Sequence, residues 1–292
     1  MTKKLIGTGI ALVTPFKQDK TIDFSSLEKL INHCINGGVE YLVTLGTTGE
    51  SVVLNKEEKQ TIIDFTAKII AERVPLLAGF GGNNTAQVIA DIQNFDLSKI
   101  DAILSASPSY NKPSQEGIYQ HYKAIAEIAP LPIVLYNVPG RTSKNMEANT
   151  TLRLANDFKN IIAIKEASGN LEQCMEIAKH RPEGFLVISG DDNLTLPMMS
   201  FGCDGVISVV GQAVPAAFSG MVRAAVSGDY NLAKDLHFKC MDLTNLLFEE
   251  NNPAGIKEAL KAINVCDNHL RLPNVSVNGD LANRIFAEMK KF

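Results

Sequence analysis

The chain has 292 residues, of which 45% are hydrophobic and 21% charged, and its net charge is −4. This size and apolar content are enough for one barrel-sized domain or for two smaller ones. Neither sign of charge dominates, so nothing favours nucleic acid or an anionic membrane as a partner. No apolar stretch approaches the ~20 residues of a membrane span.

The cysteines and histidines are dispersed along the chain. The five cysteines contain no Cys-x-x-Cys spacing, and the five histidines contain no His-x-His or His-Glu-x-x-His spacing. We therefore expect neither a disulfide framework nor a metal site. Reduced thiols are typical of a cytoplasmic protein. Glycines at positions 7 and 9 interrupt the first apolar run, so we expect no signal peptide.

Short apolar segments alternate with longer amphipathic ones. Eight apolar segments predict strands, at 9–13, 41–45, 75–79, 102–105, 133–136, 161–165, 185–188 and 206–209. Each is almost entirely apolar, as expected of parallel strands covered on both faces. The intervening segments predict helices, with start signals at Ser25, Asn55, Ser114, Glu147, Asn170 and Asp191. Eight strand–helix units predict an α/β fold, the (β/α)8 TIM barrel. A doubly wound open sheet is the alternative, but its Gly-x-Gly-x-x-Gly turn is missing.

After the eighth unit the chain has no further strong strand signal. Helical patterns at about 212–227, 230–248, 253–264 and 278–290 predict a small helical appendix, and Asn252-Pro253 is typical of a helix start. We expect a barrel over residues 1–227 and a C-terminal helical region over 228–292 that packs on it as one structural unit.

Lys165 is the most informative residue, because it ends an otherwise apolar predicted strand. In a barrel, functional residues gather where strands end. An ammonium group at this position must reach water, find a partner or lose its charge. Desolvation lowers the pKa of a buried lysine and frees the amine as a nucleophile toward a carbonyl. The alternative is a lysine whose side chain extends to solvent.

Other strand ends also carry polar groups. The turn at 46–50, Gly-Thr-Thr-Gly-Glu, suits a small carboxylate, or is a glycine turn with helix-capping threonines. Tyr136 ends the strand before that of Lys165, where it is either a core aromatic or a hydroxyl beside the amine. Arg141 can clamp a carboxylate or remain solvated. Tyr110 supplies a phenol or fills a loop.

The acidic pair Asp191-Asp192 follows the seventh predicted strand. A metal interpretation lacks a nearby histidine, so we expect these residues to cap the next helix. The loops after the seventh and eighth strands contain no lysine or arginine before Arg223. Substrates that carry phosphate, which commonly bind there in barrels, are therefore disfavoured.

Three runs resemble the dihydrodipicolinate synthase family, namely Gly46–Ser51, Tyr136–Thr142 and Ile164–Gly169. The resemblance spans nearly the whole chain. The wider superfamily includes N-acetylneuraminate lyase and related 2-oxo acid aldolases, and Gly140-Arg141-Thr142 is the part more specific to the synthases. The resemblance implies a metal-independent lyase that condenses pyruvate with L-aspartate-4-semialdehyde in the diaminopimelate and lysine branch. It implies no cofactor beyond a covalent lysine imine with pyruvate.

The resemblance also implies roles for single residues. Lys165 would form the imine, and Tyr136 would relay protons. Thr48 would connect Tyr136 to Tyr110, which an adjoining subunit would contribute. The implied substrate contacts are Thr47 and Thr48 for the pyruvate carboxylate, Arg141 for the semialdehyde carboxylate, and the backbone of Gly190 and Ile207. Family members similar to this chain are commonly tetramers of tight dimers.

One departure from the family pattern concerns feedback by lysine. Lysine-inhibited relatives use an aromatic residue, a histidine and a glutamate in an interface pocket, where this chain has Ser109, Lys56 and Gln87. An added ammonium and a lost acid predict weak or absent inhibition. Three alternative functions remain open: a pyruvate aldolase acting on a sugar acid, a metal-dependent aldolase, and a non-catalytic barrel.

Overall fold

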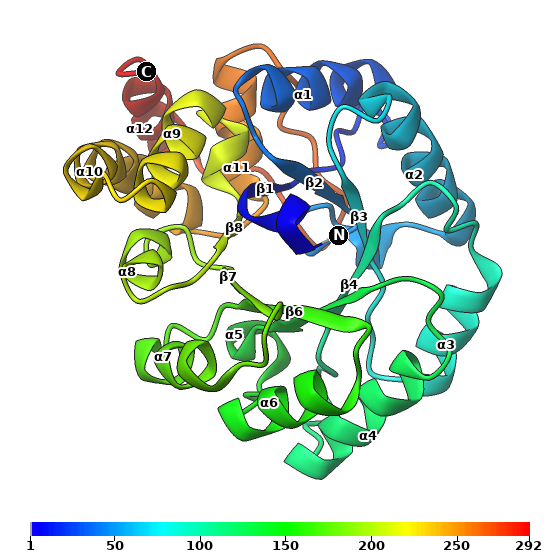
Figure 1. Cartoon of the computed structure of the whole chain (residues 1–292). Helices are drawn as coiled ribbons and strands as arrows, with labels where there is room; N and C mark the ends of the chain where they lie inside the picture. The colour runs from blue at the N-terminus through cyan, green and yellow to red at the C-terminus, as the bar shows by residue number, and fades with distance from the viewer. Residues whose placement is uncertain (1) are drawn as a thin grey trace.

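The computed structural model describes residues 2–292, and eight parallel strands close into a barrel at its centre (Figure 1). The strands are β1 (Gly7–Ala11), β2 (Tyr41–Thr44), β3 (Leu76–Gly79), β4 (Ala102–Ala106), β5 (Ile133–Asn137), β6 (Ile161–Glu166), β7 (Leu186–Ser189) and β8 (Gly205–Ser208). Each strand pairs with the next in chain order, and β8 pairs with β1 at Val206 and Thr8. This closed order confirms the predicted TIM barrel.

Helices surround the barrel between successive strands (Figure 1). They are α1 (Phe24–Asn36), α2 (Lys56–Ile70), α3 (Thr85–Asn94), α4 (Gln115–Ala126), α5 (Pro139–Thr142), α6 (Ala148–Asp157), α7 (Leu171–His180), α8 (Thr195–Ser200) and α9 (Pro215–Val226), with 3-10 turns η1 (Thr2–Leu5), η2 (Ser51–Val53) and η3 (Val210–Gln212). Asn55 and Glu58 form a capping box at the start of α2. Ser114 and Asn170 accept hydrogen bonds from backbone N–H groups in the first turns of α4 and α7. These bonds confirm the start signals at all three helices.

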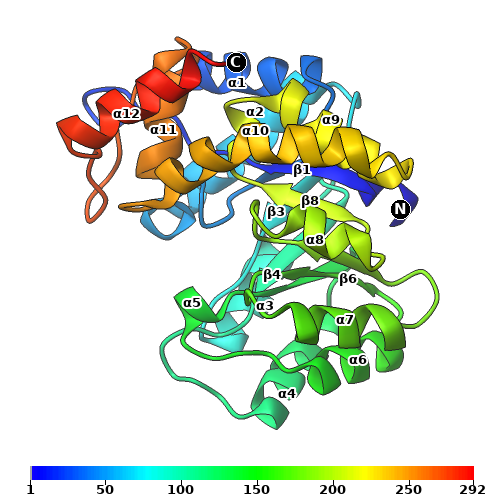
Figure 2. The same ribbon diagram turned by 90° about the vertical axis from the view of Figure 1, so that its left-hand side faces the viewer.

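Further helices follow α9 in the C-terminal region. They are α10 (Tyr230–Phe248), α11 (Ala254–Ala262) and α12 (Gly279–Met289). The α10 helix packs along α9, and α11 packs against α12. Figure 2 places α11 and α12 on the same side of the barrel as α5, which follows the carboxyl end of β5. Helices α11 and α12 therefore lie at the end where the strands finish, while the division between residues 227 and 228 stays a prediction.

Side chains alternate between the barrel interior and the layer between strands and helices. The interior cluster includes Tyr136 of β5, Ala163 of β6, Ile188 of β7 and Ile207 of β8. Alternate residues of the same strands belong to the larger core that the helices cover. Because Lys165 follows Ala163 by two positions, its side chain also points inward, at the carboxyl end of the barrel.

Candidate active site

Lys165 ends the inward-facing row of β6, and only 5% of its surface is exposed. The strand register pairs it with Tyr136, and its Nζ lies 4.3 Å from the centre of the Tyr136 ring. Burial lowers the pKa of Lys165 to about 8, while the charge of Asp192 opposes this shift and that of Arg141 adds to it. The structure therefore places an amine of weakened basicity at the mouth of the barrel.

The lowered pKa decides how much free amine exists near neutral pH. With a pKa of about 8, roughly 9% of Lys165 is uncharged at pH 7, against ~0.03% for an ordinary lysine. Only the uncharged amine attacks a carbonyl carbon, so the gain in nucleophile is ~300-fold. In the part of the chain that the structure describes, no ion pair with a carboxylate holds the proton on Lys165.

Tyr136 is a buried phenol beside this amine, with 7% of its surface exposed. Burial raises the pKa of Tyr136 to about 12, although the charge of Arg141 and a hydrogen bond with the Thr47 side chain both act to lower it. The phenol therefore keeps its proton at neutral pH. A protonated hydroxyl next to an amine can donate that proton to a reacting oxygen and later recover it.

In the turn after β2, Thr47 rather than the expected Thr48 is the neighbour of the Tyr136 hydroxyl. The Thr47 side chain acts to lower the pKa of Tyr136, and the two residues line one cavity. The Thr48 hydroxyl is buried and accepts a 2.9 Å hydrogen bond from Asn252 Nδ2. Adjacent side chains of the turn point in different directions, so only Thr47 faces the phenol. Within residues 2–292, neither threonine N–H is bonded to another backbone group, which leaves both available to a carboxylate.

A cavity of about 370 Å³ opens at this end of the barrel, and its lining includes Thr47, Tyr136 and Arg141. Arg141 lies in α5, and its guanidinium donates a 3.3 Å hydrogen bond to the backbone oxygen of Asn252. The side chain is otherwise exposed, so its remaining N–H groups can bind a carboxylate.

Gly190 lies against the Lys165 side chain, and Ile207 lies in the barrel interior; their predicted backbone contacts with substrate stay a prediction. A Cβ atom at Gly190 would meet Ala167 Cβ at 2.7 Å and Lys165 Cε at 3.0 Å. Only glycine fits this close approach to the lysine side chain. Ile207 is 1% exposed and belongs to the interior cluster that contains Tyr136.

Tyr110 is the predicted site residue that the single chain leaves outside the cavity. Its side chain is 88% exposed, and its backbone has a φ of +70°, which is unusual for a residue with a side chain. Val52, in η2, is another exposed apolar residue, with 92% of its surface exposed. The structure thus brings Lys165, Tyr136 and Thr47 together and leaves Tyr110 facing solvent.

Of the predicted capping pair, Asp191 accepts hydrogen bonds from the N–H groups of Asn193 and Leu194 in the turn that leads into α8, whereas Asp192 does not cap this helix. Helix α8 begins only at Thr195, and Asp192 Oδ2 accepts hydrogen bonds from the N–H groups of Val209 and Val210, at 3.0 and 2.9 Å. Burial raises the pKa of Asp192 to about 6, against the effect of these bonds. The pairing of β7 with β8 brings the loops after them together, which a local sequence pattern cannot show.

Asn252 is a site residue that sequence reasoning missed. The sequence predicts a helix cap at Asn252, but α11 begins at Ala254 after Pro253, and the Asn252 side chain donates a hydrogen bond to Thr48. Its Oδ1 is buried and has no hydrogen-bond partner among the described residues. No signal in the sequence near Asn252 indicates this contact, because 204 positions separate it from Thr48.

Among residues 2–292, no cluster of three or more His, Cys, Asp or Glu side chains is arranged to hold a metal ion. No helix within the same residues has the length and apolar character needed to cross a membrane.

The fold and the site together define a class of protein, a (β/α)8 barrel that presents a buried amine beside a phenol and a turn with available backbone N–H groups. The model of the dihydrodipicolinate synthetase family matches residues 4–291. The chain belongs to this family.

Individual relatives are similar over almost their whole length. The 4-hydroxy-tetrahydrodipicolinate synthase of Flavobacterium psychrophilum is 52% identical over 280 residues, which cover 96% of each chain. The crystal structure of dihydrodipicolinate synthase from Aquifex aeolicus has a TM-score of 0.95 at 37% identity and covers 98% of both chains. The Acinetobacter baumannii dihydrodipicolinate synthase complexed with pyruvate has a TM-score of 0.95 at 38% identity, also over 98% of both chains.

Proposed function

We propose that this chain is a lyase that condenses pyruvate with L-aspartate-4-semialdehyde to 4-hydroxy-tetrahydrodipicolinate. The observation that carries the proposal is the buried Lys165 amine, whose pKa is about 8, beside the Tyr136 phenol that lines the cavity. The family and the names of the curated relatives supply the two substrates. We propose that the lysine itself performs the electrophilic role, so no cofactor takes part.

The first step is imine formation. The uncharged Lys165 amine attacks the keto carbon of pyruvate, and Tyr136 protonates the oxygen that leaves as water. The N–H groups and hydroxyls of Thr47 and Thr48 hold the pyruvate carboxylate beside the amine. The proton that Tyr136 donates is recovered through the hydroxyl of Thr47, an exposed residue that lines the cavity with Tyr136.

The second step forms the carbon–carbon bond. The protonated imine withdraws electrons from the pyruvate methyl group, which loses a proton and becomes an enamine carbon. This carbon attacks the aldehyde of the semialdehyde, and Tyr136 protonates the aldehyde oxygen to a hydroxyl. Arg141 binds the carboxylate of the semialdehyde and so places the aldehyde within reach of the enamine.

Ring closure releases the product. The amino group of the bound semialdehyde attacks the imine carbon and displaces Lys165, whose amine is restored. One water leaves overall, so the product contains every atom of the two substrates except that water. A related aldolase acting on a sugar acid differs only in the acceptor and is distinguished by the Arg141 variants described below.

Reductive trapping tests the proposal. Borohydride added with pyruvate should attach one reduced pyruvyl group to the peptide that contains Lys165, and the variant Lys165→Met should remain unlabelled. Purified protein should then consume aspartate semialdehyde in the presence of pyruvate. Absence of label in the unmodified protein would refute both the imine and the proposed function. It would instead favour the non-catalytic barrel.

We also propose that a second copy of the chain completes the site, in a tetramer built from tight dimers. The exposed side chains of Tyr110 and Val52 support this, because apolar residues so fully exposed commonly mark contact surfaces. Mixing Tyr110→Phe with Lys165→Met should restore activity if the tyrosine crosses to a neighbour, since one site of each mixed dimer is then intact. Equal inactivity of the mixture would contradict this arrangement.

We place the protein in the cytoplasm. All five cysteines are free and buried, as is typical of proteins that fold in a reducing compartment.

A further inference from the structure

The turn at 46–50 is held in a conformation that its own sequence does not favour. Leu45 has a φ of +57° and Glu50 a φ of +52°, and both are residues with side chains. Such left-handed residues cost roughly 1–3 kcal/mol each and persist where the surrounding structure fixes them. The bonds inside the turn are only two, from Gly49 N–H to the Gly46 oxygen and from Glu50 N–H to the Thr47 oxygen. Contacts from outside the turn must therefore maintain it.

A second buried lysine provides the strongest of these contacts. Lys257, in α11, is completely buried, and its Nζ lies 2.6 Å from Glu50 Oε1. It also donates a 2.8 Å hydrogen bond to the backbone oxygen of His269. Lys257 thus contrasts with Lys165, because a carboxylate and a backbone oxygen fix the position of its Nζ. Lys257 does not line the cavity, so its effect on the site must pass through Glu50.

The other contacts come from both ends of the chain. Glu50 Oε2 accepts a 3.2 Å hydrogen bond from the backbone N–H of Arg271. The Thr14 hydroxyl donates a 2.7 Å bond to the Gly49 oxygen, and Asn252 donates to the Thr48 hydroxyl. Three consecutive residues of the turn, from Thr48 to Glu50, are therefore each tied to a segment distant in sequence.

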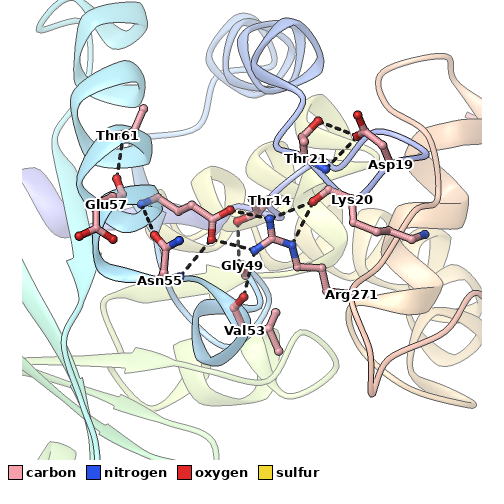
Figure 3. Close-up of polar contacts among 11 residues, drawn as sticks. Thr14, Asp19, Lys20, Thr21, Gly49, Val53, Asn55, Glu57, Thr61 and Arg271 are labelled. Carbon is pink, nitrogen blue, oxygen red and sulfur yellow. Dashed lines mark hydrogen bonds and ion pairs between the residues drawn. The ribbon is translucent and has the colours of Figure 1, made fainter.

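Arg271 also connects the C-terminal region to the segments around the turn. Figure 3 shows its guanidinium bonded to the backbone oxygens of Lys20 and Val53. The guanidinium also forms a two-point ion pair with Glu58, at 2.8 and 2.5 Å. Val53 belongs to η2, which directly follows the turn, and Glu58 belongs to the capping box of α2. The C-terminal region thus fixes the turn and the helix start that follows it.

We propose that Lys257 is a positioning residue, which holds the carboxylate-binding turn in place through its buried ion pair with Glu50. The inference rests on the proposed function, because it assigns Thr47 and Thr48 to the pyruvate carboxylate. Hydrogen-bond donors act on a substrate only when they are held within about 0.5 Å of the productive geometry. The C-terminal region then contributes to substrate binding. Loss of the ion pair should weaken pyruvate binding more than it changes the reactivity of the Lys165 amine.

The test compares two ion pairs at opposite ends of the barrel. Lys257→Met removes the ammonium and keeps an apolar side chain of similar length. The matched control, Arg181→Met, breaks the half-buried pair with Asp204, which lies before β8 at the amino end of the strands. For each protein, the pyruvate concentration that gives half-maximal borohydride trapping at Lys165 is measured at a temperature well below the midpoint of thermal unfolding. That midpoint is measured by circular dichroism.

We expect Lys257→Met to raise the half-trapping concentration on the order of 10-fold, the factor that 1.4 kcal/mol represents. The maximal trapping rate at saturating pyruvate should change by less than about twofold, because the amine is untouched. Arg181→Met should lower the unfolding midpoint and leave the trapping curve unchanged. Identical trapping curves for Lys257→Met and the unmodified protein would overturn the proposal.

A double variant keeps the test decisive if Lys257→Met does not fold. Removing one partner leaves Glu50 buried without its counter-charge, whereas replacing both charges of a buried pair is often neutral for stability. Lys257→Met combined with Glu50→Gln should therefore fold and still capture pyruvate ~10-fold more weakly. Normal capture by this double variant would also refute the positioning role. If the unmodified protein traps no pyruvate, the proposed function fails instead, so the two failures are distinguishable.

Discussion

The pH dependence of imine formation tests the chemistry of Lys165 directly. Its pKa of about 8 means that about half of the amine is uncharged at pH 8 and nearly all at pH 10. The rate of pyruvate trapping should therefore only double, roughly, between these two pH values. A lysine with the ordinary pKa of 10.5 would instead gain about 75-fold over the same interval, because its uncharged fraction rises from ~0.3% to ~24%.

Below pH 8 the expected change is large. Lowering the pH from 8 to 6 reduces the uncharged fraction from about 50% to about 1%, so the trapping rate should fall ~50-fold. Tyr136, with a pKa of about 12, keeps its proton throughout and adds no step to the profile. Initial rates of labelling by cyanoborohydride at saturating pyruvate, with the label mapped to the Lys165 peptide, measure this curve.

The decisive region is pH 8 to 10. A plateau there supports a desolvated amine, whereas a rate that rises by about 75-fold between these pH values, as for an ordinary lysine, would refute the reasoning. Lys165→Met serves as the blank for labelling at other lysines. An exposed lysine elsewhere on the protein, measured by acetylation in the same samples, provides the reference for ordinary behaviour.

Other expected outcomes follow from neighbouring residues. The pKa of Asp192 is about 6 against an ordinary 3.8, so the folded state loses stability as the pH rises from about 4 to about 6. Asp192→Asn should therefore raise the free energy of unfolding at pH 7 by up to ~3 kcal/mol, and an unchanged urea midpoint would contradict this. Arg141→Gln should reduce kcat/KM for the semialdehyde on the order of 100-fold while pyruvate trapping persists. If kcat/KM and the trapping rate fell equally, a different acceptor would be favoured. With Lys56, Ser109 and Gln87 in place of the family's inhibitory residues, sub-millimolar lysine should leave the steady-state rate unchanged, and measurable inhibition would disprove that expectation.

The barrel and its central amine follow from local patterns in the sequence. Each strand is a short apolar run, and the polar caps at Asn55, Ser114 and Asn170 mark helix starts within a few residues of them. Barrel closure places consecutive strands side by side, so the adjacency of Tyr136 and Lys165 required only their positions at two strand ends. Both depend on interactions close in sequence or on a simple topological rule.

Which polar groups meet in the site was decided only by the tertiary structure. The family resemblance implied Thr48 as the partner of Tyr136, but in the folded chain Thr47 acts on the Tyr136 hydroxyl while Thr48 is bonded to Asn252. The same turn is fixed by Asn252 and Lys257, more than 200 positions away. Such contacts carry no periodicity, because a buried hydrogen bond or ion pair depends on where two distant backbones happen to approach. The sequence alone therefore determined the scaffold and its nucleophile, and the folded chain determined what holds and orients them.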